Sequence, residues 1–390
     1  MKRSIRNEIV TSMDAIHFSP AQKDAMVHKL LHAQKEPVKS FSSRKILLIA
    51  AAAVMLIAML TGAAVFTRWS NTAQNRYNPS QDVKEQAEKS GLSVMLEETK
   101  ESENPNEVLS VTDNGITISA IQTIVDNYQA EITFRIEGFE LPEDHTPGVW
   151  PSITIDGQED FYAMQTGQFY HGTTYNEAGE WVYVSTGEPV KYRNDEFQSA
   201  IMDYVADDGS LEYTHYITFD EADGRWLDKE IVVTFHSINV QSDQKAEKDE
   251  PLVEGNWELK WTLTGADSNI KISPNAKIGD SDVILLDAEI GQKTIRARYQ
   301  LKDYWEGWDE LVTLPQAVYG IRMKDGSEYF CGGGTGGFED QENMIYFTEF
   351  DISNAILDLS QVESLMFHKG WEKDDNGELT VQTFYYLPIG

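Results

Sequence analysis

Glu131-Ile-Thr-Phe-Arg-Ile-Glu137 alternates apolar residues with charged or polar ones. Because successive side chains of a strand point to opposite faces, this alternation predicts a β-strand with one face in a core and the other in water. The same alternation recurs at 115–121, 213–219, 257–263 and 294–299. Denser apolar runs at 231–235, 283–286 and 380–387 are typical of strands that are covered on both faces. Many strands at short intervals predict a mainly β fold built from antiparallel sandwiches.

Turn residues and polar runs divide these strands into groups. Pairs such as Asn114-Gly115 and Asp156-Gly157 favour tight turns. We interpret the polar run QSDQKAEKDE, residues 241–250, as a hairpin loop in preference to a domain linker. A better boundary is the small and polar stretch 265–270. We therefore predict two immunoglobulin-like β-sandwiches, at 108–265 and 266–390.

Residues 46–66 read ILLIAAAAVMLIAMLTGAAVF and carry no charge. At about 1.5 Å per helical residue, a helix of this length spans the roughly 30 Å hydrocarbon layer of a bilayer. We predict a transmembrane helix, with a buried core helix or a cleaved secretory signal as the alternatives. The polar segment 67–107, which contains Pro79 and Pro105, predicts a stalk with one helical stretch near 83–89.

Charge sets the expected orientation in the membrane. The chain has 32 Lys and Arg against 64 Asp and Glu, a formal charge of -32, which disfavours binding to nucleic acid. Lys and Arg within about 18 residues of the apolar stretch favour a cytoplasmic N-terminus and an extracytoplasmic C-terminus. They are Lys29, Lys35, Lys39, Arg44 and Lys45 before it and Arg68, Arg76 and Lys84 after it.

The N-terminal segment 1–45 predicts two short helices. Ser19 and Pro20 are typical of the first turn of the second helix. The two helices carry apolar residues at helical spacing. These residues are too few to form a core that would let the segment fold alone. We therefore expect them to bind a partner through residues 1–42; the alternative is a basic tether. The predicted partner-binding residues are Ile9, Met13, Met26, Val27, Leu30 and Leu31.

One cluster outside the membrane has the residue types of a ligand site. Trp305 and Trp308 suit stacking on sugar rings, and Asp303 and Asp309 suit bonding to hydroxyl groups. The alternative is that both indoles close the rim of a sandwich. The glycine-rich run 331–338 lacks the lysine of a phosphate-binding loop, and we interpret it as a loop between strands.

No nucleophile, base and orienting group fall into a recognised arrangement, so we predict neither a catalytic site nor a metal or cofactor, and no enzyme.

The order of these parts resembles a known family. The basic start with Ile5, Ile9 and Met13, the single anchor, and the exterior segments Gly255-Asn-Trp-Glu-Leu-Lys-Trp261 and Tyr319-Gly-Ile-Arg-Met-Lys-Asp-Gly326 carry the likeness. They resemble Gram-positive bacterial single-pass membrane proteins that have an anti-sigma-like N-terminal segment and an immunoglobulin-like extracytoplasmic domain of unknown function. The resemblance implies that the inner segment holds a sigma factor. The His and Cys pattern that binds zinc in many anti-sigma domains is missing here.

Two functions are therefore kept open. In the first, the exterior senses the envelope and the N-terminal helices sequester a sigma factor or another cytosolic protein. In the second, the chain is a membrane-anchored module that binds cell-wall glycan or another carbohydrate through Trp305 and Trp308.

Overall fold

The computed structural model describes residues 69–96, 107–142, 145–176, 178–192, 199–206, 208–220, 224–242, 250–267, 269–302, 317–373 and 379–389. These ranges belong to one compact unit, Trp69–Gly390. The fold is mainly β, as the alternating patterns predict. The N-terminal segment 1–45 and the apolar stretch 46–66 lie outside the described residues.

Among the helices that the structure describes, none is long and apolar enough to cross a bilayer.

The first sheet is antiparallel and has six strands. Its order is β1-β3-β4-β10-β7, and β2 also pairs with β3. The strands are β1 (Ser93–Met95), β2 (Ser110–Asp113), β3 (Ile116–Val125), β4 (Gln129–Glu137), β7 (Tyr162–Phe169) and β10 (Leu211–Phe219). Asn114 and Gly115 both have positive φ and form the predicted turn between β2 and β3. Three of the predicted strands are therefore neighbours in one sheet.

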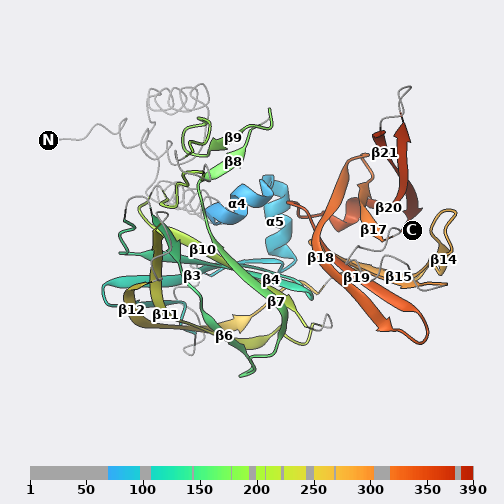
Figure 1. Ribbon diagram of the computed structural model, residues 1–390. Helices are drawn as coiled ribbons and strands as arrows, with labels where there is room; N and C mark the ends of the chain where they lie inside the picture. The colour runs from blue at the N-terminus through green and yellow to red at the C-terminus, as the bar shows by residue number, and fades with distance from the viewer. Residues whose placement is uncertain are drawn as a thin grey trace, which may run out of the picture. The chain divides into compact units, whose positions relative to one another are not determined.

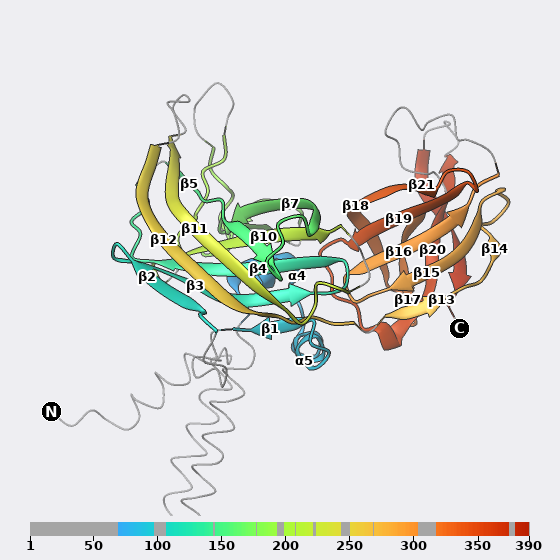
Figure 2. The same cartoon turned by 90° about the horizontal axis from the view of Figure 1, so that it is seen from below.

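A second, four-stranded sheet packs against the first (Figures 1 and 2). It contains β5 (His145–Gly148), β6 (Ser152–Ile155), β11 (Lys229–Ser242) and β12 (Glu250–Leu263). β11 and β12 pair antiparallel on either side of the polar run 241–250, as expected for a hairpin. The core between the two sheets contains Phe134, Phe235 and Trp257. A two-stranded piece, β8 (Thr173–Tyr175) and β9 (Trp181–Tyr183), is separate from both sheets.

The C-terminal half forms one nine-stranded sheet around its own core. The order is β13-β15-β16-β19-β18-β17-β20-β21, and β14 pairs with β15. The strands are β13 (Ile270–Ile272), β14 (Ala276–Lys277), β15 (Ile284–Ile290), β16 (Thr294–Gln300), β17 (Val318–Met323), β18 (Glu328–Asp340), β19 (Ile345–Ile352), β20 (Val362–Lys373) and β21 (Leu379–Pro388), with the 3₁₀ turn η3 (Leu359–Gln361) before β20. β18 pairs with β17 through its first residues and with β19 through the rest. The buried residues of the first core precede 265–270 in the sequence, and those of the second core follow it.

Two helices precede the first sheet and lie between the two halves (Figure 1). They are α4 (Asn71–Tyr77) and α5 (Gln81–Lys89). Ser70 and Ser80 cap them by accepting hydrogen bonds from backbone N–H groups. Their apolar residues form a third buried cluster with residues from both halves of the unit. The members of that cluster are Trp69, Ala73, Tyr77, Ala87, Leu92, Ile124, Ala266 and Ile356.

Residues 69–96 therefore differ from the stalk that the sequence predicts for 67–107. They are part of the folded unit because their polar side chains find buried partners. Asn71 donates to Glu212 at 2.9 Å, and Gln86 donates to Asp358 at 2.9 Å. A polar composition does not distinguish a solvated stalk from helices that pack through polar contacts of this kind.

The packing of α5 gives a first prediction. Ala87 is fully buried within the third cluster, so Ala87→Leu must displace its neighbours. We expect it to lower the free energy of unfolding by about 1–3 kcal/mol, measured by equilibrium denaturation followed by tryptophan fluorescence. The matched control Lys89→Leu, at an exposed position of the same helix, should change it by no more than about 0.5 kcal/mol. Equal effects would mean that α5 is not packed.

Candidate ligand-binding cleft

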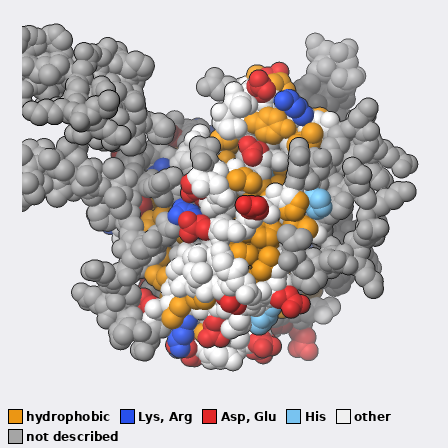
Figure 3. Space-filling view, turned by 90° about the vertical axis from the view of Figure 1, so that its left-hand side faces the viewer, with side chains coloured by type: hydrophobic (Ala, Val, Ile, Leu, Met, Phe, Trp, Pro, Cys, Tyr) orange, Lys and Arg blue, Asp and Glu red, His pale blue; other side chains and the backbone are white. Residues whose placement is uncertain are grey.

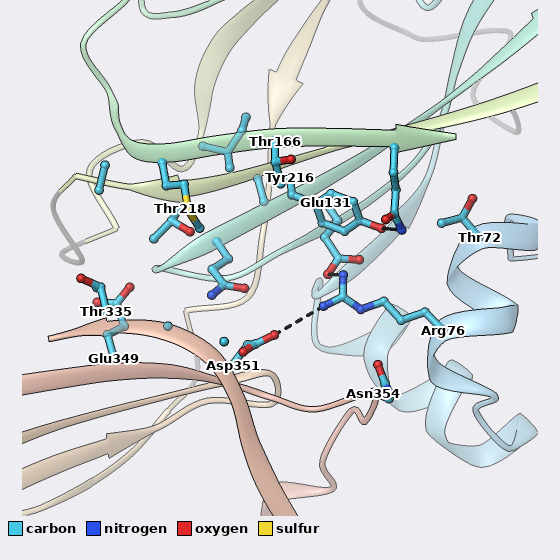
Figure 4. A pocket seen from close by; sticks show the side chains of 18 of the residues that line it. Thr72, Arg76, Glu131, Thr166, Tyr216, Thr218, Thr335, Glu349, Asp351 and Asn354 are labelled. Atoms are coloured by element: carbon cyan, nitrogen blue, oxygen red, sulfur yellow. Dashed lines mark hydrogen bonds and ion pairs between the residues drawn. The ribbon is translucent and has the colours of Figure 1, made fainter. Parts of the chain in front are cut away.

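A cleft of about 750 Å³ opens between the first sheet and strands β18 and β19, beside α4 (Figure 4). Its lining comes from three parts of the chain that are far apart in sequence. One face of the unit elsewhere carries Asp and Glu side chains spread among apolar ones, and the Lys and Arg side chains there are isolated (Figure 3). Charged groups of both signs meet at the cleft.

The outer face of the first sheet forms one wall. The strand register places Tyr216 of β10 between Glu131 of β4 and Thr166 of β7. The next row of the same face is Gln129, Thr218 and Met164. The sequence predicts that this polar face is in water. Part of it is instead covered, because Thr72 of α4 donates its backbone N–H to Glu212 at 3.1 Å.

Strands β18 and β19 form the facing wall. Glu349 and Asp351 of β19 are two residues apart and so lie on one face of the strand. Thr335 of β18 pairs with Glu349. A Cβ at Gly334 would lie 2.1 Å from the carbonyl oxygen of Glu349, so only glycine fits there.

The interpretation of 331–338 as a loop between strands is wrong. The whole run lies within β18, and all of it except Gly332 and Gly333 pairs with β19. Its glycines permit a close approach of neighbouring strands, whereas glycine in a sequence is a general signal for loops.

A buried ion cluster joins the two walls to α4. Lys293, only 1% exposed, is 2.5 Å from Glu131, and Tyr77 also donates to this carboxylate. Arg76 is 3.2 Å from Glu131 and 3.4 Å from Asp351. Burial opposes the ionisation of Glu131, but the charges of Lys293 and Arg76 outweigh it and lower its pKa. The cluster therefore holds Glu131 as a carboxylate.

Arg76 is also held by an aromatic ring. Its guanidinium lies over Tyr216, 5.0 Å from the ring centre, and Figure 4 shows it between Glu131 and Asp351. Because Arg76 belongs to α4, any change in the cleft that moves this side chain acts directly on that helix.

Glu349 differs from the other acids of the cleft. It is 5% exposed, and within the described ranges no hydrogen bond or ion pair reaches its carboxyl group. Arg296, its neighbour on β16, lies instead 3.7 Å from Glu339 and over the ring of Phe347. Burial raises the pKa of Glu349 to about 7; the charge of Arg296 lowers it and that of Asp126 raises it. Glu349 thus exchanges its proton near neutral pH.

This pKa predicts a pH dependence of stability. A folded-state pKa above the unfolded value of about 4.3 means that the folded chain binds more protons between about pH 4.3 and 7, so stability falls as the pH rises through that window. Glu349→Gln should remove this fall and raise the melting temperature at pH 8 more than at pH 5. Thermal unfolding at both pH values tests this. Glu363→Gln, at an exposed position, is the control and should follow wild type.

The residues that the sequence singles out lie elsewhere. Trp305, Trp308, Asp303 and Asp309 are outside the described residues, and so are all six predicted partner-binding residues of the N-terminal segment. Sequence reasoning did not single out Arg76, Glu131, Lys293 or Glu349. The signal was present only as polar residues on the outward face of predicted strands, which is also the pattern of a solvated face.

Within the part of the chain that the structure describes, no group of three His, Cys, Asp or Glu side chains could hold a metal ion.

No protein-family model matches this sequence, and no curated protein is similar enough to compare with it. Among solved structures, the chain is similar to one described as the crystal structure of the conserved domain protein from Bacillus anthracis. The TM-score is 0.41 at 12% identity, over 77% of this chain and 95% of that chain. A likeness at this score supports no inference about function.

Proposed function

We propose that the chain is a single-pass membrane signalling protein of the anti-sigma-factor type. Its β-rich part senses a condition of the envelope from the extracytoplasmic side, and residues 1–42 sequester a sigma factor on the cytoplasmic side. The observation that carries the proposal is the place of α4. Only Thr67 and Arg68 separate the apolar stretch 46–66 from Trp69, which is already buried in the folded unit.

This short connection supplies a route for a signal. Thr72, Asn75 and Arg76 of α4 line the cleft. A ligand that contacts these residues and binds more tightly to one arrangement of α4 than to another shifts the helix toward the arrangement that it binds more tightly. We propose that a shift of α4 is transmitted along this short length of chain to the apolar stretch.

The arrangement of the sheets supports the proposal that the extracytoplasmic part consists of two immunoglobulin-like sandwiches. Two antiparallel sheets around one core favour an immunoglobulin-like sandwich for 108–265. The nine-stranded sheet around the second core favours a second sandwich for 266–390. We assign no catalytic role and no cofactor to either.

Affinity purification of the full-length protein from its own cells tests the proposal. Wild type should retain a sigma factor, identified by mass spectrometry. Leu30→Asp with Leu31→Asp should abolish retention because both residues lie on the expected apolar stripe. The matched control, Ala25→Asp with His32→Asp, lies on the opposite side of that helix and should retain it. If wild type retains no sigma factor, the proposal fails.

A second arm tests the link to the cleft. Arg76→Gln should change the fraction of sigma factor retained because it releases α4 from Glu131 and Asp351. Lys271→Gln removes an exposed cation from β13 and should leave retention unchanged.

The alternative, a membrane-anchored module that binds carbohydrate, is favoured by one observation. Tyr319 of β17, Phe330 of β18 and Tyr386 of β21 are 38%, 41% and 42% exposed. Phe384 lies among them, with ring centres 5.4–6.5 Å apart. Exposed aromatic faces of this kind suit sugar rings. If Phe330→Ala with Tyr386→Ala abolishes retention on purified cell wall and leaves sigma-factor retention unchanged, wall binding is a separate function of this surface.

A further inference from the structure

We propose that the cleft binds a ligand that carries a primary ammonium group, held by Glu349 with Asp351 beside it. The proposal rests on the signalling function above in taking this cleft as the sensory site, and it names the chemistry of what is sensed. It stands on the geometry of β19, on the balance of charges in the cleft and on the polarity of the remaining lining.

Among the described residues, the charges around the cleft pair with one another except for one acid. Arg76 and Lys293 supply two positive charges, and Glu131 and Asp351 supply two negative ones, all linked by contacts of 2.5–3.4 Å. Glu349 lines the same cleft but is outside this cluster. An ionised carboxylate that is buried without a cation is costly, so an incoming cation gains from pairing with it.

Asp351 also has unused hydrogen-bonding capacity. Its Oδ2 accepts from Arg76, whereas its Oδ1 is buried and has no partner among the described residues. A Cβ at Gly333 would be 3.5 Å from this Oδ1, so the glycine leaves space beside it. Among the described residues, none donates a hydrogen bond to the Glu349 carboxyl group or to Oδ1 of Asp351, and an ammonium group has three donors.

The rest of the lining suits the polar body of such a ligand. Thr166, Thr218 and Thr335 present hydroxyl groups to the space, as Figure 4 shows, and Gln129 adds an amide. Burial lowers the pKa of His171, which disfavours its charged form. Three acids against one lining cation disfavour an anionic ligand, and the formal charge of -32 for the whole chain attracts cations. An amino sugar and a peptide with a free lysine amine share this chemistry.

Isothermal titration calorimetry of the full-length protein in nanodiscs tests the proposal. The probes are glucosamine, the dipeptide Gly-Lys and cadaverine, each beside its N-acetylated form. At least one free amine should bind saturably at pH 8, and its acetylated form should not. Tightest binding of glucosamine indicates a sugar source, and tightest binding of Gly-Lys indicates a peptide source.

Glu349→Gln is nearly isosteric and should weaken binding of the best probe by about tenfold or more, the usual cost of losing a charge-assisted hydrogen bond. Glu363→Gln, an exposed carboxylate of β20, is the matched control and should bind like wild type. Binding of cadaverine, whose amines stay protonated at both pH values, should also weaken from pH 8 to pH 5.5, because Glu349 is then protonated before the amine arrives.

Three results would each overturn the ammonium proposal: no binding of any free amine to wild type, equal binding of acetylated probes, or unchanged binding to Glu349→Gln. Different results would overturn the signalling proposal. If no amine binds but Arg76→Gln still changes sigma-factor retention, only the ligand class is wrong. If an amine binds but wild type retains no sigma factor, the cleft binds its ligand for another purpose.

Discussion

We expect Lys293→Met to lower the free energy of unfolding by about 3–5 kcal/mol at pH 7, because it leaves Glu131 buried without its closest cation. Lys293 approaches Glu131 to 2.5 Å from the turn between β15 and β16 in the other half of the unit, so its loss also weakens the junction between the halves. Equilibrium denaturation followed by tryptophan fluorescence measures the change. The loss should shrink as the pH falls and Glu131 takes up a proton.

Two further variants separate the charge from the side-chain volume. Lys271→Met removes a lysine that is 71% exposed, and we expect a change below about 1 kcal/mol. Lys293→Met combined with Glu131→Leu removes both buried charges, and it should cost less than the sum of the single variants. If the two effects simply add, the pair is not coupled as its geometry indicates.

Trp257→Ala should have a second large effect, a loss of about 3–5 kcal/mol of unfolding free energy, because it opens a cavity in the first core. The side chain is fully buried, and its indole N–H donates to the carbonyl oxygen of Ile116 at 3.0 Å. A Cβ at Gly255 would lie 2.4 Å from the indole, so the ring fills the space that this glycine leaves. Denaturation by guanidinium, followed by far-ultraviolet circular dichroism, measures the loss.

The controls for Trp257 come from the same residue type. Trp257→Phe keeps most of the buried ring and should cost clearly less than alanine. Trp150 is 58% exposed at the edge of the ring of His215, and Trp150→Ala should change stability by no more than about 0.5–1 kcal/mol. A loss at Trp150 equal to that at Trp257 would contradict the position of the core.

Much of the fold was predictable because strand patterning is local. The alternation at 131–137 and 213–219 identified β4 and β10, which lie side by side in the first sheet. Asn114-Gly115 identified a hairpin, since both residues adopt the positive φ that this turn requires. The run 331–338 was predicted as a loop because its glycines are a general signal for loops. The close approach of β19, which requires glycine at Gly334, cannot be read from the residues of the run itself.

The cleft was not predictable in the same way. Alternation shows that Glu131, Tyr216 and Thr218 share an outward face, but it does not show what faces them. The composition of 69–96 indicated a solvated stalk, because the acids and strands that its helices pack against are distant in sequence. Glu212 is 140 residues from Thr72, whose backbone N–H it accepts.

The sequence by itself determined a mainly β fold, its turns and the positions of two successive groups of strands, because side-chain alternation and turn chemistry depend on residues a few positions apart. Only the tertiary structure decided that Arg76 meets Asp351, 275 residues away, that Lys293 meets Glu131, 162 residues away, and that no cation of the described residues pairs with Glu349. Coulombic pairing and desolvation depend on distance in space, and a pattern of period two carries no information about which strands from the two halves of the chain come to face each other.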